Sequence, residues 1–457
     1  MLRVFNHYVS TKKAVFFFTE TWSIGIACFL GAGILARLMA PTTEHLTLKA
    51  TVPLFALVSL SFVASLQFAL YLFDLYDLRI AQEDRARGLR ILKAVGAAAV
   101  LVGVTVTLLH LRLPTGTLLG GALGAFAGTV AVRMSLRSVV GHANRVLLIG
   151  NGVKSLSVLK AIEEGGEDAY QIVARIEPPR AGVERHLSEP LDETARNLRA
   201  EYVVMAVDEP RGAIWVEELV RCRFQGMRVY DAAGFSERVL RRVPVAHVKA
   251  SEFAFCDDVH ASRVRESFKR AFDLLMAAAL LVCATPAVLV VAVLIKLDSE
   301  GPVLYSQERV GRAGKSYRLW KFRSMRTDAE KNGAVWARSN DDRVTRMGRF
   351  IRKTRIDEIP QVFNVLLGDM SFVGPRPERP VFVEQLKRQI PFYSLREGVK
   401  PGITGWAQIR YPYGASVEDA RNKLEFDLYY VKNGSLFLDL GIIFHTVRHV
   451  LFGRGAR

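Results

Sequence analysis

The stretch Arg343–Pro380, RVTRMGRFIRKTRIDEIPQVFNVLLGDMSFVGPRPERP, decides how the rest of this chain is interpreted. Two adjacent carboxylates, Asp357 and Glu358, follow a run of cations: Arg343, Arg346, Arg349, Arg352, Lys353 and Arg355. The turn Gly374-Pro375-Arg376-Pro377 comes after them. Cations beside an acid pair suit a polyphosphate substrate, because cations hold phosphoryl oxygens while acids hold a divalent metal or attack phosphorus. The alternative is a solvated helix face of alternating charge.

Length and composition predict a membrane protein with two or three domains and anionic partners. The chain has 457 residues, 50% of them hydrophobic, and a net charge of +17. Anionic lipid, a phosphorylated substrate and nucleic acid all fit this charge. No nucleic-acid-binding module is recognisable, so we expect no nucleic-acid partner. The four cysteines have no CxxC spacing, which predicts reduced packing residues without disulfides or a zinc site.

Four apolar runs fill the first third, each near the ~20 residues that a helix needs to cross a bilayer. They are Ala14–Leu35, Val52–Phe73, Ile91–Leu111 and the glycine-rich Leu113–Val132. Cations cluster before the first run, between the second and third, and after the fourth, so both ends of this bundle should be cytoplasmic. Glu20 lies inside the first run and is either a functional intramembrane acid or, as we favour, an acid that extends to the interface.

After Asn144 the pattern changes to alternating strands and helices, which predicts a parallel sheet of Rossmann type. The turn Gly150–Ser155 has Ser155 where a dinucleotide fingerprint needs its third glycine, and the second strand lacks the usual terminal acid. A regulatory or assembly role is therefore a better interpretation than cofactor binding.

A fifth apolar run, Leu274–Ile295, would be another membrane span by hydropathy alone. Cations flank both of its ends, and Thr285-Pro286 interrupts the middle, where proline removes a helical hydrogen bond. We therefore predict a helix, 268–297, that breaks at this point, enters one leaflet and returns to the same face. A fifth crossing would also place the basic C-terminal third outside the cell.

Several strings resemble those of the bacterial monotopic phosphoglycosyl transferases, the sugar transferases that start polysaccharide chains on polyprenyl phosphate. The densest is RIDEIPQVFNVLLGDMSFVGPRP within the opening stretch. The others are KRAFD at Lys269–Asp273, QERVG at Gln307–Gly311, KFRSM at Lys321–Met325, PGITGWAQ at Pro401–Gln408 and DLYYV at Asp427–Val431. The resemblance covers nearly the whole chain and includes a Rossmann-like middle module in the larger members.

The resemblance implies a two-step phosphoryl exchange on the cytoplasmic face of the bacterial inner membrane. An aspartate attacks the β-phosphorus of a UDP-sugar and releases UMP, and polyprenyl phosphate then accepts the phosphosugar. The resemblance makes Asp357 the nucleophile, with Mg²⁺ held by Asp357 and Glu358. Direct transfer between two bound substrates is the mechanism that the residues alone leave open. The substrate-binding candidates are Arg309, Lys321, Arg323, Gln361, Asn364, Arg376 and Asp427, and those of the membrane hairpin are Lys269, Arg270, Asp273, Thr285 and Pro286.

The predicted architecture has three parts: a four-helix transmembrane bundle (1–140), a degenerate Rossmann-like α/β domain (141–250) and a mostly helical α/β catalytic domain with the re-entrant hairpin (251–457). The predicted partners are a UDP-sugar, polyprenyl phosphate, the membrane, a second copy of the chain and downstream glycosyltransferases. The competing hypothesis is a non-catalytic membrane scaffold or nucleotide-sensing regulator. Trp406 contacts either the core or the sugar, and Leu436–Phe452 could lie in the membrane interface.

Overall fold

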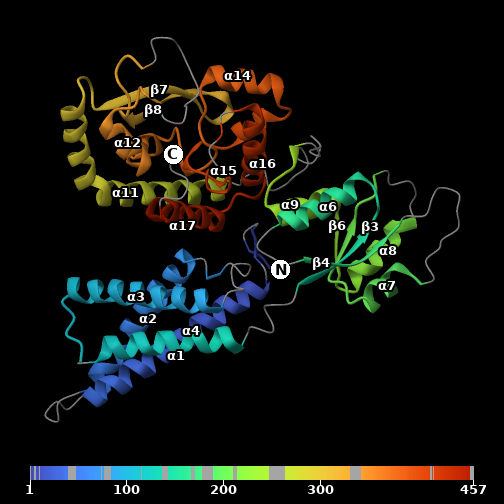
Figure 1. Cartoon of the computed structure of the whole chain (residues 1–457), viewed down its shortest axis with the longest axis horizontal. Coiled ribbons are helices and arrows are strands. Elements are labelled where there is room, and N and C mark those ends of the chain that lie inside the picture. Colours follow the sequence, from blue (N-terminus) through green and yellow to red (C-terminus); the bar gives the residue numbers. More distant parts are fainter. Residues whose placement is uncertain are drawn as a thin grey trace. The chain divides into compact units, whose positions relative to one another are not determined.

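The computed structural model describes residues 2–4, 7–9, 11–39, 48–73, 75–76, 84–114, 116–135, 143–165, 170–177, 189–208, 214–245, 263–329, 341–411, 414 and 416–452 (Figure 1). The chain forms two compact units, with the boundary between Ala232 and Ala233. A short N-terminal piece is grouped with the second unit. The boundary predicted at residue 250 lies outside the described residues, and the three-domain division stays a prediction.

Four long helices form the N-terminal bundle, as predicted: α1 (Thr11–Met39), α2 (Leu48–Leu72), α3 (Asp84–Leu108) and α4 (Thr117–Ser135). Each contains a segment long and apolar enough to cross a membrane. Two short strands, β1 (Leu2–Val4) and β2 (His7–Val9), precede them. Most of the cationic loop between α2 and α3 lies outside the described residues, so the orientation of the bundle stays a prediction.

The glycines of α4 let its backbone touch that of α1. A Cβ on Gly120 would collide with the carbonyl oxygen of Gly31, and one on Gly124 would collide with that of Ala27. Small residues four apart permit this approach between membrane helices, where dispersion contacts stabilise association. The glycines that lower the hydropathy of the fourth run are therefore its packing surface.

Glu20 is fully buried in the bundle and is ion-paired with α4. Arg133 Nε lies 2.7 Å from Glu20 Oε1, and Arg133 NH1 donates to the carbonyl of Leu75 at 2.8 Å. The guanidinium also lies over the rings of Phe16 and Tyr76. Contrary to the predicted extension toward an interface, Glu20 ties α1 to α4 and to the residues that follow α2.

The middle region is the predicted parallel sheet, in the strand order β4-β3-β5-β6. Its strands are β3 (Asn144–Ile149), β4 (Tyr170–Ile176), β5 (Tyr202–Met205) and β6 (Arg228–Asp231). Helices α7 (Leu191–Asn197) and α8 (Ile214–Phe224) pack on one face, and α6 (Val153–Glu164) lies on the other (Figure 1). The strand order reverses between β3 and β5, the point at which doubly wound sheets bind ligands.

The second unit contains α9 (Ala232–Leu240) and a mostly helical assembly around two small sheets. Strands β7 (Leu304–Val310) and β8 (Ser316–Phe322) form an antiparallel hairpin around the 3₁₀ turn η4 (Arg312–Gly314). Strands β9 (Ser371–Val373) and β10 (Gly402–Thr404) pair in parallel. The remaining elements are α11 (Arg263–Asp298), α12 (Arg346–Lys353), η5 (Ile356–Glu358), α13 (Gln361–Leu367), α14 (Pro380–Gln389), η6 (Tyr393–Gly398), α15 (Trp406–Arg410), α16 (Val417–Asn433) and α17 (Leu436–Phe452).

Helix α11 continues through Pro286, where the sequence predicts a break. Figure 1 shows two arms that meet at an angle, so the proline bends the helix without ending it. The hydroxyl of Thr285 donates to the carbonyl of Leu281 at 2.6 Å. The arm before the proline packs Ala277 among residues of α13, and the later arm packs Ile295 among residues of β8 and α12. Both arms therefore pack against other elements of the second unit.

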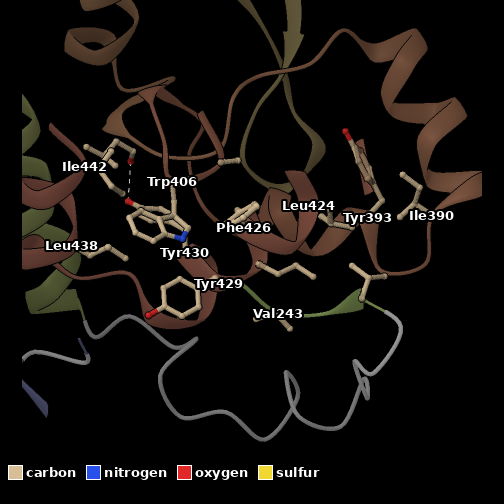
Figure 2. Close-up of a cluster of buried hydrophobic side chains, with 14 of the residues drawn as sticks. Val243, Ile390, Tyr393, Trp406, Leu424, Phe426, Tyr429, Tyr430, Leu438 and Ile442 are labelled. Atoms are coloured by element: carbon tan, nitrogen blue, oxygen red, sulfur yellow. Dashed lines mark hydrogen bonds between the residues drawn. The ribbon is translucent and has the colours of Figure 1, made fainter. Parts of the chain in front are cut away.

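The main core of this unit is rich in aromatic residues (Figure 2). Trp406 is 3% exposed, stacks on Tyr429 with a ring separation of 6.0 Å, and donates its indole N–H to the carbonyl of Arg241 at 2.9 Å. Trp406 is thus a packing residue. Val243, which follows α9, packs into the same cluster, so the segment between α9 and residue 245 belongs to this core.

Helix α17 contributes to the core through one face, with Leu438 and Ile442 buried. Phe437, Leu440 and Phe444 remain between 38% and 47% exposed. The apolar pattern predicted for an interfacial helix is therefore shared between the core and an exposed face.

Candidate active site

The acid pair lies on a single 3₁₀ turn between two short helices. Thr345 caps the N-terminus of α12, and its hydroxyl accepts the N–H of Gly348 at 2.9 Å. Arg355 has a φ of 59°, a left-handed conformation that residues other than glycine rarely adopt. This residue reverses the chain before η5, and Pro360 then precedes α13. Strained backbone of this kind is concentrated at functional sites.

Glu358 is held by cations from three elements. Its Oε1 atom accepts a hydrogen bond from Arg376 at 2.8 Å and lies 3.5 Å from Lys321 Nζ and 3.8 Å from Arg355 NH1. Burial by itself would raise the pKa of Glu358, but the charges of Arg376, Lys321 and Arg355 outweigh it and hold the pKa below its ordinary value. Glu358 is therefore an ionised and fixed carboxylate.

Asp357 is as buried as Glu358, at 7% exposure, but its carboxylate is uncommitted. Within the described part of the chain, no hydrogen bond or ion pair joins this carboxylate to another residue. Burial and then the charge of Glu358 raise the pKa of Asp357 to about 6, against the opposing charges of Lys321, Arg352 and Arg376. Asp357 is thus ionised at neutral pH and has no bond that would lower its nucleophilicity.

Each of the two small sheets supplies a cation next to the acid pair: Lys321 from β8 and Arg376 from the turn after β9. Burial lowers the pKa of Lys321, an effect that Glu358 and Asp357 oppose while Arg376 adds to it. Arg376 also donates to Gln408 Oε1 at 3.3 Å, a contact from α15. These cations come from β8 and from the turn after β9, so the two small sheets position the charges around the carboxylates.

Glycines fix the turn that carries Arg376. A Cβ on Gly374 would collide with the carbonyl of Lys400, and one on Gly405 would collide with the carbonyl of Gly374. The N–H of Gly374 donates to the carbonyl of Thr404 at 2.9 Å, which continues the β9–β10 pairing into the turn. The Gly-Pro-Arg-Pro and Pro-Gly-Ile-Thr-Gly elements are therefore two halves of one backbone assembly.

Arg309 lies at the edge of this assembly, where it binds the turn as well as the hairpin. It donates to the carbonyl of Pro377 at 3.1 Å and to Gln307 Oε1 at 2.6 Å, and lies 3.8 Å from Glu378. Burial lowers the pKa of Arg309, partly opposed by Glu378. Its Nε is buried without a hydrogen-bond acceptor among the described residues.

Two other predicted substrate-binding residues have structural contacts here, and a third is buried. Arg323 donates to the carbonyls of Glu300 at 2.6 Å and Ser299 at 2.7 Å, next to the end of α11. Asn364 accepts the N–H of Trp320 at 3.0 Å and donates to the carbonyl of Arg318 at 2.7 Å, which braces β8. Gln361 is 3% exposed. A substrate contact by any of the three stays a prediction.

The KRAFD segment, Lys269–Asp273, lies within α11 and contacts the strand that leads into the Gly-Pro-Arg-Pro turn. Lys269 Nζ lies 3.1 Å from Asp273 Oδ1 and 2.8 Å from Asp439 Oδ2, and it donates to the carbonyl of Val373 at 3.4 Å. Asp273 accepts the N–H of Phe372 at 3.0 Å. Arg270 donates to the carbonyls of Val365 and Leu366 at the end of α13. The hairpin residues before the apolar run therefore fix the strand that leads into Arg376.

Sequence reasoning missed Arg396, Gln408 and Asp439 as contributors to the site. Gln408 lies inside a quoted motif, and its spacing from the two glycines could have suggested a contact with the turn. Asp439 stands out only as a charge within an apolar helix. Arg396 has no local signal, because its partner Asp427 lies on another element at a separation of 2.8 Å.

In the middle sheet, a carboxylate of the chain itself occupies the N-terminus of α6. Asp208 accepts the N–H groups of Val153 and Lys154, each at 2.9 Å. These backbone hydrogen bonds lower the pKa of Asp208. Helix N-termini at this position of a Rossmann fold bind phosphate. The incomplete fingerprint thus coincides with a helix end that Asp208 already caps.

The described residues contain no group of three or more His, Cys, Asp or Glu side chains placed to hold a metal ion. A smaller set of donors, the carboxylates of Asp357 and Glu358, fits a divalent cation. The Asp357 carboxylate is uncommitted, and the three cations around Glu358 all approach its Oε1 atom. Mg²⁺ is commonly bound by one or two carboxylates together with substrate phosphates and water, which this pair could supply.

An uncommitted carboxylate beside fixed cations is the kind of site that phosphoryl-transfer enzymes use. Residues 264–453 match the model of a family described as bacterial sugar transferase. The exopolysaccharide production protein PSS of Rhizobium leguminosarum bv. phaseoli is 45% identical over 188 residues, which is 39% of this chain and 92% of that protein. The chain belongs to the bacterial sugar transferase family.

Two longer relatives match over part of their length. The UDP-N-acetylgalactosamine-undecaprenyl-phosphate N-acetylgalactosaminephosphotransferase of Aeromonas hydrophila is 45% identical over 250 residues, 55% of this chain and 58% of the relative. The UDP-glucose:undecaprenyl-phosphate glucose-1-phosphate transferase of Escherichia coli (strain K12) is 43% identical over 192 residues, 42% of this chain and 41% of the relative. The chain thus aligns with about half the length of these two proteins.

Proposed function

We propose that this protein transfers a sugar 1-phosphate from a UDP-sugar to undecaprenyl phosphate or a similar polyprenyl phosphate, with release of UMP. This is the first membrane step in making exopolysaccharide, capsule or O-antigen. The observation that carries the proposal is the difference between the two acids, since Asp357 is uncommitted while Glu358 is fixed by Arg376 at 2.8 Å. The names of the relatives, which act on UDP-sugars and undecaprenyl phosphate, support the same substrates.

In the first step, a carboxylate oxygen of Asp357 attacks the β-phosphorus of the UDP-sugar. A P–O bond forms between Asp357 and the β-phosphorus. The bond from this phosphorus to the oxygen that bridges the α- and β-phosphorus atoms breaks, and its electron pair leaves with UMP. In the second step, an oxygen of the polyprenyl phosphate attacks the same phosphorus, and the electron pair of the acyl phosphate bond returns to Asp357. Neither step requires a proton, which suits a site in which cations keep Glu358 ionised and the pKa of Asp357, about 6, leaves it ionised at neutral pH.

Arg376 and Lys321 stabilise the negative charge on the phosphoryl oxygens, because both are fixed and partly shielded from water. A planar guanidinium such as that of Arg376 can contact two phosphate oxygens at once. Arg309 extends the cationic surface toward the β7–β8 hairpin.

Asp357 and Glu358 are the residues that would hold Mg²⁺, and the ion would neutralise charge on the diphosphate when bound. Excess chelator should abolish UMP release, and added Mg²⁺ should restore it. Full turnover in the presence of chelator would remove the metal role of Glu358.

We further propose that α11 is re-entrant and that the catalytic unit lies on the cytoplasmic face of the inner membrane, with α1–α4 as spanning helices. The contacts of both α11 arms with the same unit support this topology, because a straight crossing would carry one arm away from it. Cysteines introduced at Ser299 and Asn144 should both be labelled only from the cytoplasmic side. Labelling of the Ser299 position from outside would refute the topology.

Release of UMP from a panel of UDP-sugars by purified membranes tests the proposed function and identifies the sugar. Wild-type protein given labelled UDP-sugar without lipid should retain label that hydroxylamine releases. Asp357→Asn should bind the UDP-sugar but retain no label and release no UMP. Kinetics that require a ternary complex, or full activity of Asp357→Asn, would exclude the covalent mechanism. Assembly with a second copy or with downstream glycosyltransferases is a further expectation that co-purification would test.

The hypothesis of a nucleotide-sensing regulator has less support. It depends on the Gly150–Ser155 turn, and Asp208 takes the N–H groups of Val153 and Lys154 that a phosphate would need.

A further inference from the structure

Arg396 makes a set of contacts that joins η6 and α16 to the turn Gly374–Pro377. Its Nε donates to Asp427 Oδ2 at 3.0 Å, and NH2 lies 2.8 Å from the same oxygen. NH2 also donates to the carbonyl of Arg376 at 2.8 Å. NH1 donates to the hydroxyl of Tyr393 at 3.1 Å, and the guanidinium lies 5.3 Å from the centre of that ring. The Arg396 and Asp427 side chains are 10% and 3% exposed.

The carbonyl of Arg376 is the backbone group through which Arg396 holds this turn. Pro375 has a fixed φ, and Pro377 restricts the residue before it to extended conformations. Pro377 also has no N–H with which to anchor the next peptide. The torsions that remain, ψ of Pro375 and φ of Arg376, would swing the Arg376 carbonyl and side chain together. Among the described residues, the donor that holds this carbonyl is Arg396.

Rotation about these torsions would move the Arg376 guanidinium relative to the acid pair. That guanidinium is 2.8 Å from Glu358 Oε1 and 3.3 Å from Gln408 Oε1. A buried ion pair is weak evidence for stability, because desolvation cancels much of the attraction. Arg396–Asp427 is a buried pair of this kind, and its additional hydrogen bond ends on the backbone of a proposed catalytic residue.

We propose that Arg396 is a positioning residue that sets the Arg376 guanidinium for phosphoryl transfer, and that Asp427 acts through Arg396 without contacting the substrate. This inference rests on the proposed sugar-phosphate transfer. Under this inference, Asp427 has a positioning role, whereas the family resemblance implies that Asp427 contacts the substrate.

A double-mutant cycle on the full-length membrane protein separates positioning from general support of the fold. Arg396→Lys keeps the charge but loses the planar fork, so it cannot hold Asp427 and the Arg376 carbonyl together. We expect kcat for UMP release to fall about 10- to 100-fold, because small displacements of catalytic groups have effects of this size. KM for the UDP-sugar should change less than about threefold, as for a contact that matters in the transition state.

The same change in an Arg376→Lys background should lower kcat less than about threefold further, because the group that Arg396 positions is already altered. Asp427→Asn should reproduce the effect of Arg396→Lys, and Asp427→Glu should restore part of the activity. Glu397→Gln is the matched control, since Glu397 lies next to Arg396 but pairs with Lys387 at 2.7 Å. This control should stay within about twofold of wild type.

Equal losses from Arg396→Lys in both backgrounds would overturn the positioning role and indicate support of the fold alone. So would wild-type kcat in Arg396→Lys. An increase in KM for the UDP-sugar in Asp427→Asn, with kcat unchanged, would show instead that Asp427 binds substrate. A wild-type protein that releases no UMP from any UDP-sugar would refute the proposed function, and the positioning role with it.

Discussion

Asp357→Asn should make the protein more stable while it abolishes transfer. The folded protein raises the pKa of Asp357 from 3.8 to about 6, which means that the ionised carboxylate is less favourable there than in the unfolded chain. A shift of about two pKa units corresponds to roughly 3 kcal/mol at about 1.4 kcal/mol per unit, as an upper estimate for a coupled pair. An uncharged side chain of the same shape removes this unfavourable term.

The size of this stability difference depends on pH in a defined window. The destabilisation by Asp357 is fully present above its folded pKa of about 6 and disappears as the pH falls toward the unfolded value of 3.8. The melting temperature of metal-free Asp357→Asn in detergent with chelator should therefore exceed that of wild type at pH 7.5, and the difference should shrink toward pH 4.

Glu358→Gln supplies the opposite control on the neighbouring residue. Because the surrounding cations hold the pKa of Glu358 below its ordinary value, its charge stabilises the folded state at pH 7.5. This variant should melt below wild type. The electrostatic interpretation of the pair would be wrong if both variants shifted the melting temperature in the same direction.

Three further predictions follow from the site and the core. Single-turnover UMP release should fall about tenfold between pH 7 and pH 5, because the nucleophile must be ionised and the pKa of Asp357 is about 6; a flat profile would contradict this. Gly405→Ala should lower the melting temperature and the rate together, because its Cβ would meet the Gly374 carbonyl, at a cost of about 1–3 kcal/mol; unchanged stability and activity would show that the turn can relax. A fragment that begins at Ala233 should melt higher than one that begins at Arg263, because the shorter fragment lacks Val243 in the core; equal melting temperatures would show that the segment adds nothing.

The sequence predicts well those features that depend on composition and local spacing. The four apolar helices and the parallel middle sheet are of this kind, because each is determined by hydropathy or by periodicity. Pro286 shows where local rules become insufficient. Proline predicts either a break or a bend, and the packing of both arms of α11 on one unit accompanies a bend.

Partners far apart in the chain could not be predicted from the sequence. Asp439 pairs with Lys269 across the catalytic unit, and Arg396 pairs with Asp427 on another helix. Neither pair has a fixed spacing, so a charge within an apolar helix suggests a buried partner without identifying it. Arg323 and Asn364 illustrate the same point, since conspicuous polar residues near a site can be fixed by backbone groups.

The carboxylate of Asp208 at the start of α6 has a consequence for how the middle sheet responds to its surroundings. Folds that rely on a bound phosphate at this helix end gain stability in proportion to the logarithm of ligand concentration. Here the anion is covalently part of the chain, so its effective concentration is constant. We expect the folding of this sheet to be insensitive to the nucleotide content of the cell. The quantity of intact enzyme would then be independent of the supply of the nucleotide sugar on which it is proposed to act.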